Sequence, residues 1–267
     1  MLNPRTVASL SALKKRVGRF LDSRLYHRGE IADLIRRFDA NMEVAIFGGM
    51  LRDLSMGGNT SFWSDVDLVV AGVKPDELAR SLEVYRPARN SFGGYRIFLR
   101  RWRADVWPLE ATWAFRAGQV RGNTFRDLIH TTFFNWDAIV YEVSRGGIHC
   151  LPGYLRAVRT GLLDINLELN PSPIKTVVRT LRFWLSGRAA LAPRLATYLA
   201  TRLTEFTERE ICASEAEGYE RRTLDEKAVA RIKELLERHL ADSTNSPFAS
   251  RSTQLRLRIA GRRPEEW

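Results

Sequence analysis

The chain has 267 residues, enough for one large domain or two modest ones, and its hydrophobic content of 45% is ordinary for a globular protein. Its 42 Lys+Arg against 31 Asp+Glu give a net charge of +11, which favours nucleic acid or a phosphate-rich ligand as partner, although charge alone does not exclude a solubilising role. The two isolated cysteines argue against a disulfide scaffold and a zinc site. No apolar run approaches transmembrane length, which argues against a membrane partner, and so we expect a cytoplasmic protein.

The apolar pattern of the first half predicts two helices and then a series of strands. Helical spacing places an amphipathic helix within residues 5–26 and a second helix over about 30–38. Short apolar or alternating runs predict strands at residues 44–47, 65–70, 95–99, 104–107, 138–143 and 148–151. A tight basic turn is expected at residues 100–103, between two of these strands.

The pattern changes after Pro171 and Pro173. From there the apolar residues recur at helical spacing, so an all-helical region is expected. The tail after Ala241 is rich in Ser, Asn, Pro and Arg, which predicts loose order. Its arginines resemble a nucleic-acid-binding tail, with a solubilising tail as the alternative.

Pairs of acids one residue apart are candidate metal ligands. The chain contains three such pairs: Asp65/Asp67, Glu208/Glu210 and Glu215/Glu217. Only the first lies in a predicted strand, and the other two occur in polar helical sequence, where we expect solvated faces. Residues two apart on a strand point to the same face, so Asp65 and Asp67 can share Mg²⁺, which prefers oxygen ligands. Two such ions about 4 Å apart would clamp the attacking and leaving oxygens of a phosphoryl displacement.

A diglycine follows the first predicted strand and precedes a helix. Gly48 and Gly49 allow backbone N–H groups to approach phosphate oxygens closely, and the helix N-terminus adds partial positive charge. Arg52, one turn into that helix, can add a charge-assisted bond to phosphate. We assign Asp53 a structural role, either holding Arg52 or capping the turn.

Asp105 lies in another apolar strand, where an unpaired acid is costly. A third carboxylate beside the pair would complete a metal site and could accept the proton of an attacking hydroxyl. The alternative is an ion pair with Arg100, Arg101 or Arg103.

Taken together, the GGxxRD segment at residues 48–53, the DxD strand at 65–67 and the later Asp105 resemble the polymerase-β-type nucleotidyltransferase superfamily. The closer likeness is to the head of tRNA CCA-adding enzymes and bacterial poly(A) polymerases. Residues 132–141 are similar to the family's Asp-Phe-Thr-Ile-Asn-Ala-like stretch, and 179–183 to its helical neck.

The resemblance implies an α+β fold, with a small mixed β-sheet nucleotidyltransferase head flanked by helices and followed by an all-helical neck and body. On this basis the chain divides into four parts: N-terminal helices at 1–40, the catalytic head at 41–170, the neck and body at 171–242, and a basic flexible tail at 243–267. It also implies Mg²⁺ dependence, with Mn²⁺ as the alternative ion, use of a nucleoside triphosphate such as ATP, and binding of RNA, with tRNA as a candidate.

The resemblance also bears on basic residues outside the metal site. Lys175, Arg179 and Arg182 recur along one side of the predicted neck helix, where the family binds nucleotide, and Arg126 could contact the triphosphate or the acceptor. A solvated basic face is the alternative in each case. CCA-adding enzymes read the incoming base with a Glu-Asp-x-x-Arg motif, and residues 171–176 contain neither acid. Base selection by that device is therefore not expected.

The leading hypothesis is metal-dependent transfer of a nucleoside monophosphate from a triphosphate to a hydroxyl, favouring an RNA 3′ end, with release of pyrophosphate. The three aspartates would bind the metal ions, and the diglycine turn with Arg52 would hold the triphosphate. The same chemistry could instead modify a protein, modify a tRNA as a toxin, or make a signal nucleotide. A non-catalytic RNA-binding module is a further alternative, but such a module has no need to gather acids beside phosphate.

Overall fold

The computed structural model describes residues 5–39, 42–57, 62, 64–90 and 93–244. The chain forms two compact units, Met1–Thr160 and Gly161–Trp267. The predicted tail at residues 243–267 lies outside the described residues apart from the end of the last helix, and so does most of the segment between residues 57 and 64. No described helix combines the length and the apolar character that crossing a membrane requires.

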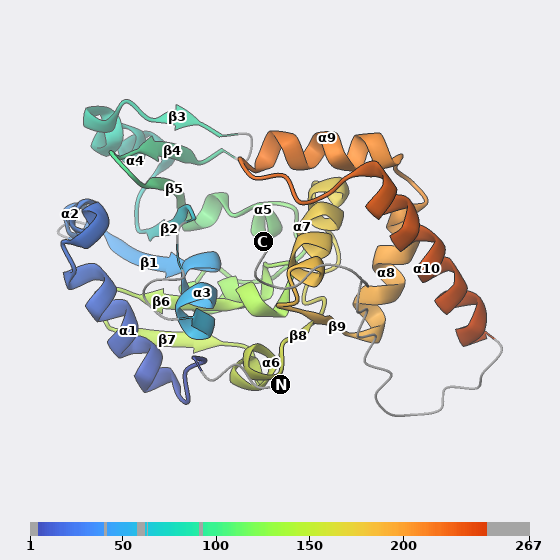
Figure 1. Ribbon diagram of the computed structural model, residues 1–267. Helices are drawn as coiled ribbons and strands as arrows, with labels where there is room; N and C mark the ends of the chain where they lie inside the picture. Colours follow the sequence, from blue (N-terminus) through green and yellow to red (C-terminus); the bar gives the residue numbers. More distant parts are fainter. Residues whose placement is uncertain (1–4, 40–41, 58–61, 63, 91–92, 245–267) are drawn as a thin grey trace. The chain divides into compact units, whose positions relative to one another are not determined.

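The first unit contains a mixed sheet with the strand order β3-β4-β5-β2-β1-β6-β7 (Figure 1). Its strands are β1 Glu43–Phe47, β2 Val66–Ala71, β3 Ala88–Arg89, β4 Tyr95–Phe98, β5 Arg103–Pro108, β6 Ile139–Glu142 and β7 Gly147–Cys150. The pair β2 and β5 is parallel, and the other neighbouring strands are antiparallel. All six predicted strands are confirmed to within one residue at each end, while the short β3 was not predicted.

Helices and 3-10 turns complete the first unit. They are α1 Leu10–Asp22, α2 Arg28–Asp39, α3 Gly49–Gly57, α4 Pro75–Leu82, α5 Trp113–Arg116, α6 Tyr154–Thr160, η1 Leu25–His27, η2 Glu83–Tyr85, η3 Leu109–Ala111, η4 Phe125–His130 and η5 Asn135–Asp137. The Ser9 hydroxyl oxygen caps α1 by accepting from the Ala12 N–H at 3.1 Å. The last carbonyls of α3 lack partners within the helix. Two of its carbonyls accept from the N-terminal segment instead: Leu54 from the Arg16 guanidinium at 2.8 Å, and Ser55 from the Val7 N–H at 2.9 Å.

The two faces of the sheet differ in burial: Val66, Leu68, Ala104 and Val106 are buried, whereas the face that carries Asp67 is covered only in part. Ala45 and Val69, on β1 and β2, pack with Phe125 and Leu128 of η4 in one apolar cluster. Because side chains alternate along a strand, Asp67 points to the same face as Val69. The cluster therefore covers the later part of β2, and the acids lie at its beginning.

The second unit is mainly helical. Its elements are α7 Pro173–Leu185, α8 Pro193–Leu203, α9 Glu208–Gly218, α10 Glu226–Thr244 and two short paired strands, β8 Leu162–Leu163 and β9 Ala190–Leu191. Proline at the start of α7 and α8 suits the fixed backbone of a first helical residue. Apolar residues of all four helices form one core. Among the residues described there, the short β9 strand departs from the predicted all-helical region.

Candidate functional site

Two of the predicted carboxylates lie on the central parallel strands. Asp67 of β2 is paired directly with Asp105 of β5. Side chains of directly paired residues project from the same face of a sheet, so the two carboxylates share the partly covered face. Asp65 is two residues before Asp67, and all three side chains are half-buried. The structure thus places the three aspartates on one face of two neighbouring strands, and their metal-binding role stays a prediction.

Two arginines contact these carboxylates. Arg96 of β4 donates from Nε to Asp105 Oδ1 at 2.8 Å and from Nη2 to Asp105 Oδ2 at 2.6 Å, and its Nη2 lies 3.9 Å from Asp65 Oδ2. Arg103 Nε donates to Asp65 Oδ1 at 2.8 Å. The hydrogen bonds with Asp105, together with the charges of the three aspartates, raise the pKa of Arg96. The chain itself therefore supplies positive charge where a cation was predicted.

The arginine paired with Asp105 was not among the candidates from the sequence. The turn lies at residues 99–102, where the Leu99 N–H donates to the Trp102 carbonyl oxygen at 2.8 Å. Arg96 consequently stands opposite Asp105. A turn at residues 100–103 would have placed Phe98 opposite Asp105 instead, and Phe98 is two residues from Arg96 along β4. The sequence signal that was missed is the alternation in residues 95–98, which puts Arg96 on the same face as the acids.

The diglycine turn lies beside Asp67. Phe47, the last residue of β1, pairs with Asp67. Gly48 has φ of +66°, in the left-handed region that favours glycine, and a Cβ at this position would lie 4.0 Å from Asp67 Oδ2. Helix α3 begins at Gly49, so its first N–H groups, which have no partners within the helix, are at the same corner. This is the arrangement that the predicted triphosphate site requires.

Arg52 is buried beneath this turn. It is 7% exposed, and it donates from Nε to Asp53 Oδ1 at 3.0 Å and from Nη1 to Asp137 Oδ1 at 2.5 Å. Burial alone would lower the pKa of this guanidinium, but the ion pairs outweigh it and raise the pKa. A Cβ on Gly49 would lie 3.6 Å from Arg52 Nη2. Arg52 therefore ties α3 to η5, the structural role of Asp53 is confirmed, and a phosphate contact of Arg52 stays a prediction.

The other predicted nucleotide-binding residues occur in both units. Arg126 is exposed on η4 of the first unit. Lys175 is exposed on α7 of the second unit, where Arg179 is half-buried with its guanidinium carbon 5.7 Å from the centre of the Phe183 ring. Their contacts with nucleotide stay predictions.

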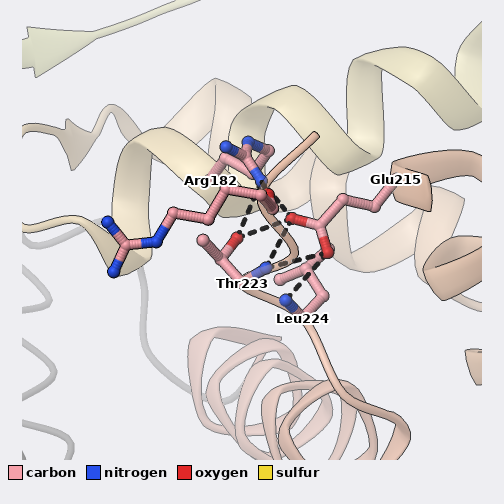
Figure 2. A network of polar contacts seen from close by, with 5 residues as sticks. Arg182, Glu215, Thr223 and Leu224 are labelled. Carbon is pink, nitrogen blue, oxygen red and sulfur yellow. Dashed lines mark hydrogen bonds and ion pairs between the residues drawn. The ribbon is translucent and has the colours of Figure 1, made fainter. Parts of the chain in front are cut away.

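Arg182 is engaged within the second unit (Figure 2). Its Nη1 donates to the Glu215 carboxylate, to the Arg221 carbonyl oxygen at 2.9 Å and to the Thr223 hydroxyl oxygen at 3.1 Å. Its guanidinium carbon also lies 3.8 Å from the centre of the Tyr219 ring. Arg182 therefore has a structural role beside any contact with nucleotide.

The expectation that Glu215 lies on a solvated face is wrong. Its side chain is 0% exposed, because α9 turns it toward α7 and the segment after α9 folds over it. Glu215 accepts from the backbone N–H of Thr223 at 3.0 Å and of Leu224 at 2.9 Å (Figure 2). Glu217, two residues on, is exposed as expected.

The carboxylates can still hold a divalent cation, although an arginine now competes for them. Among the described residues, no three acidic, histidine or cysteine side chains gather as a ready metal-binding group. Asp65 and Asp105 instead contact Arg103 and Arg96. Carboxylate oxygens on one face are the donors that Mg²⁺ prefers, and the guanidinium held between them marks a position that stabilises positive charge. The residues fit the ion, provided that Arg96 releases Asp105.

The first unit combines a mixed sheet, acids on its central parallel strands and a diglycine turn, and the second unit is mainly helical. Solved structures share this fold. A Thermotoga maritima CCA-adding enzyme complexed with tRNA has a TM-score of 0.58 and 17% identity, over 85% of this chain and 54% of that one. A CCA-adding enzyme with CTP has a TM-score of 0.60 and 18% identity, over 85% and 55%. A CCA-adding enzyme with ATP has a TM-score of 0.56 and 18% identity, over 83% and 54%.

These matches confirm the fold predicted from the resemblance. The chain spans about half the length of the solved structures it matches. No family profile matches the sequence, and no curated protein matches it.

Proposed function

We propose that this protein is a Mg²⁺-dependent nucleotidyltransferase that moves a nucleoside monophosphate from a triphosphate to a hydroxyl at an RNA 3′ end and releases pyrophosphate. The observation that carries the proposal is the direct pairing of Asp67 with Asp105, beside the left-handed Gly48 that precedes α3. The fold shared with CCA-adding enzymes solved with tRNA, CTP and ATP supports it and makes tRNA a candidate acceptor.

Each group of the site has a separate task in this proposal. The backbone N–H groups at the start of α3 bind the triphosphate, and the buried Arg52 keeps this helix start in place. A carboxylate oxygen of Asp105 accepts the proton of the attacking hydroxyl, once Arg96 has released it. Asp65, Asp67 and Asp105 would hold Mg²⁺, which when bound offsets the charge of the phosphates.

The second unit would contribute nucleotide contacts. We assign Lys175 and Arg179 of α7 to this task. Arg182 stabilises the same helix through its ion pair with Glu215. Residues 41–170 would act as the catalytic head and 171–242 as the neck and body, and we place the reaction in the cytoplasm. The compact units themselves divide at residue 160.

A labelling experiment tests the proposal. The full chain is incubated with Mg²⁺, total RNA and each α-labelled nucleoside triphosphate in turn, and the products are separated into RNA, protein and small-molecule fractions. We expect label in RNA, and a loss of roughly 100-fold or more in the Asp67→Asn variant. Asp76→Asn, which changes an exposed acid on α4, is the matched control and should retain activity.

The fractions also distinguish the alternatives. Label in protein or in small molecules would identify a different acceptor for the same chemistry. No label in any fraction, with Asp67→Asn indistinguishable from the unmodified chain, would refute nucleotidyl transfer and favour a binding module.

A further inference from the structure

Phe98 is an exposed aromatic residue at the end of β4. Its exposed fraction is 61%, whereas its neighbour Ile97 is completely buried. The alternation of a strand places Phe98 on the same face as Arg96, which contacts Asp105. No aromatic ring among the described residues packs against Phe98, so its own ring remains available for a ligand.

The sheet register places Phe98 next to the aspartates. Phe98 pairs with Arg103, and Arg103 donates to Asp65 at 2.8 Å. Two residues further along β5 and β2, the directly paired residues are Asp105 and Asp67. Two residues of a strand span about 7 Å. Together with one strand spacing of about 4.8 Å, this places Phe98 roughly 8 Å from Asp105, a separation that one nucleotide can span.

The turn that follows Phe98 is basic. Arg101 is exposed, and the side chains of Arg100 and Arg103 are 81% and 50% exposed. Arg100 and Arg103 contact Glu30 and Asp65, but both remain accessible to a second, anionic partner. An aromatic platform flanked by arginines is a typical means of binding single-stranded nucleic acid, because stacking tolerates any base and the cations follow the phosphates.

The order of the strands determines which substrate can reach this place. The proposed triphosphate site is at the end of β1, and Phe98 is on β4, with β2 and β5 and their aspartates between them. These three strand spacings correspond to roughly 14 Å. In phosphoryl transfer the attacking and leaving oxygens are in line on opposite sides of the phosphorus. If pyrophosphate leaves on the β1 side, the attacking hydroxyl arrives from the β4 side.

From these observations we infer that Phe98 and the arginines at positions 100, 101 and 103 bind the 3′-terminal nucleotide of a single-stranded RNA acceptor, with its base stacked on the Phe98 ring. We call this the Phe98 surface. The inference rests on the proposed nucleotidyl transfer for the direction of attack, and it adds where the acceptor binds and that its end is unpaired.

Binding of a fluorescein-labelled single-stranded RNA to the full chain, measured by fluorescence anisotropy at one salt concentration without triphosphate, tests the inference. Phe98→Leu keeps an apolar side chain but removes the ring, and should weaken binding by about 5- to 100-fold, the usual effect of losing one base–aromatic stack. Phe98→Trp should bind at least as well as the unmodified chain. Val84→Ala, at an exposed apolar residue of η2, is the control and should change the affinity less than twofold.

A parallel titration with a fluorescent ATP analogue identifies which base occupies the surface. We expect Phe98→Leu to leave the affinity for the analogue unchanged within twofold. If Phe98→Leu weakens binding of the analogue and not of RNA, the base on Phe98 belongs to the triphosphate and the inference is overturned. Equal RNA affinities of Phe98→Leu and Val84→Ala would overturn it as well.

Failure of the inference can be distinguished from failure of the proposed function. RNA binding requires no catalysis, so a chain that labels no product but loses RNA affinity in Phe98→Leu would refute the transfer and support the Phe98 surface. An active chain whose RNA affinity does not depend on Phe98 would refute only the surface.

Discussion

Replacing Glu215 by Gln should destabilise the second unit strongly. The substitution keeps the shape of the side chain but removes the negative charge that faces Arg182. It also turns one acceptor oxygen into an NH₂ group, while the donors around it, including the Leu224 N–H at 2.9 Å, remain. At least one donor of this buried cluster therefore loses its acceptor.

The size of the effect follows from the burial of this cluster. Breaking a buried ion pair by changing one partner costs about 3–5 kcal/mol. We expect the lower end, about 3 kcal/mol, because Arg182 keeps its bond to the Arg221 carbonyl oxygen and its side chain is 21% exposed. For a chain of this size the loss corresponds to a fall in Tm of roughly 6–12 °C.

Thermal unfolding of the full chain, with hydrogen exchange of peptides covering residues 208–226, measures the effect where it arises. Glu217→Gln, at the exposed acid of the same helix, is the matched control and should change stability by less than about 0.5 kcal/mol. If Glu215→Gln and Glu217→Gln unfold at the same temperature, the cluster contributes no net stability and the reasoning is refuted.

The penalty should also depend on pH. Burial alone would raise the pKa of Glu215, but hydrogen bonds from Thr223, Leu224 and Arg182 outweigh it and lower the pKa. A group with a lowered folded-state pKa contributes stability above its unfolded pKa, about 4.3 for Glu, and loses this contribution as the pH falls through the folded value. The difference in stability between Glu215→Gln and the unmodified chain should therefore shrink below about pH 4. A difference that stays constant down to pH 3 would contradict an ionised Glu215.

Three further predictions concern the first unit. Gly48→Ala should cost about 1–2 kcal/mol in chemical denaturation, because φ of +66° is strained for any residue with a Cβ; no change would show that the turn can adopt another conformation. Arg52→Met removes the cation that Asp137 and Asp53 contact, and should lower the free energy of unfolding by about 3–5 kcal/mol. Arg52→Lys should recover only part of this loss, because a single ammonium cannot replace the planar guanidinium. Arg96→Gln should lower the Mg²⁺ concentration needed for half-maximal labelling, because the competitor for the aspartates is gone; an unchanged or higher requirement would show that Arg96 does not compete with the metal.

The sequence alone was enough to locate the strands and to select the acids of the candidate site. Strand positions follow from short runs of residues that are either continuously apolar or alternate between apolar and polar, so β1, β2 and β5 were predicted to within one residue. The diglycine turn and the acids Asp65 and Asp67 were recognisable because their neighbours along the chain define them. Asp105 was recognisable as an acid in an apolar strand, although its partner was not.

Only the tertiary structure decided which charges meet. The pairing of Arg96 with Asp105 depends on the register of the β4–β5 hairpin, which a one-residue shift of the turn would change. Arg52 and Asp137 are 85 residues apart, and their contact depends on how α3 and η5 pack. Glu215 lies in polar helical sequence, and it is buried because the segment after α9 folds back over it to satisfy its oxygens. Local periodicity determines which residues share a face, whereas long-range packing determines what that face contacts, and so the roles of these charged residues follow from the fold as a whole.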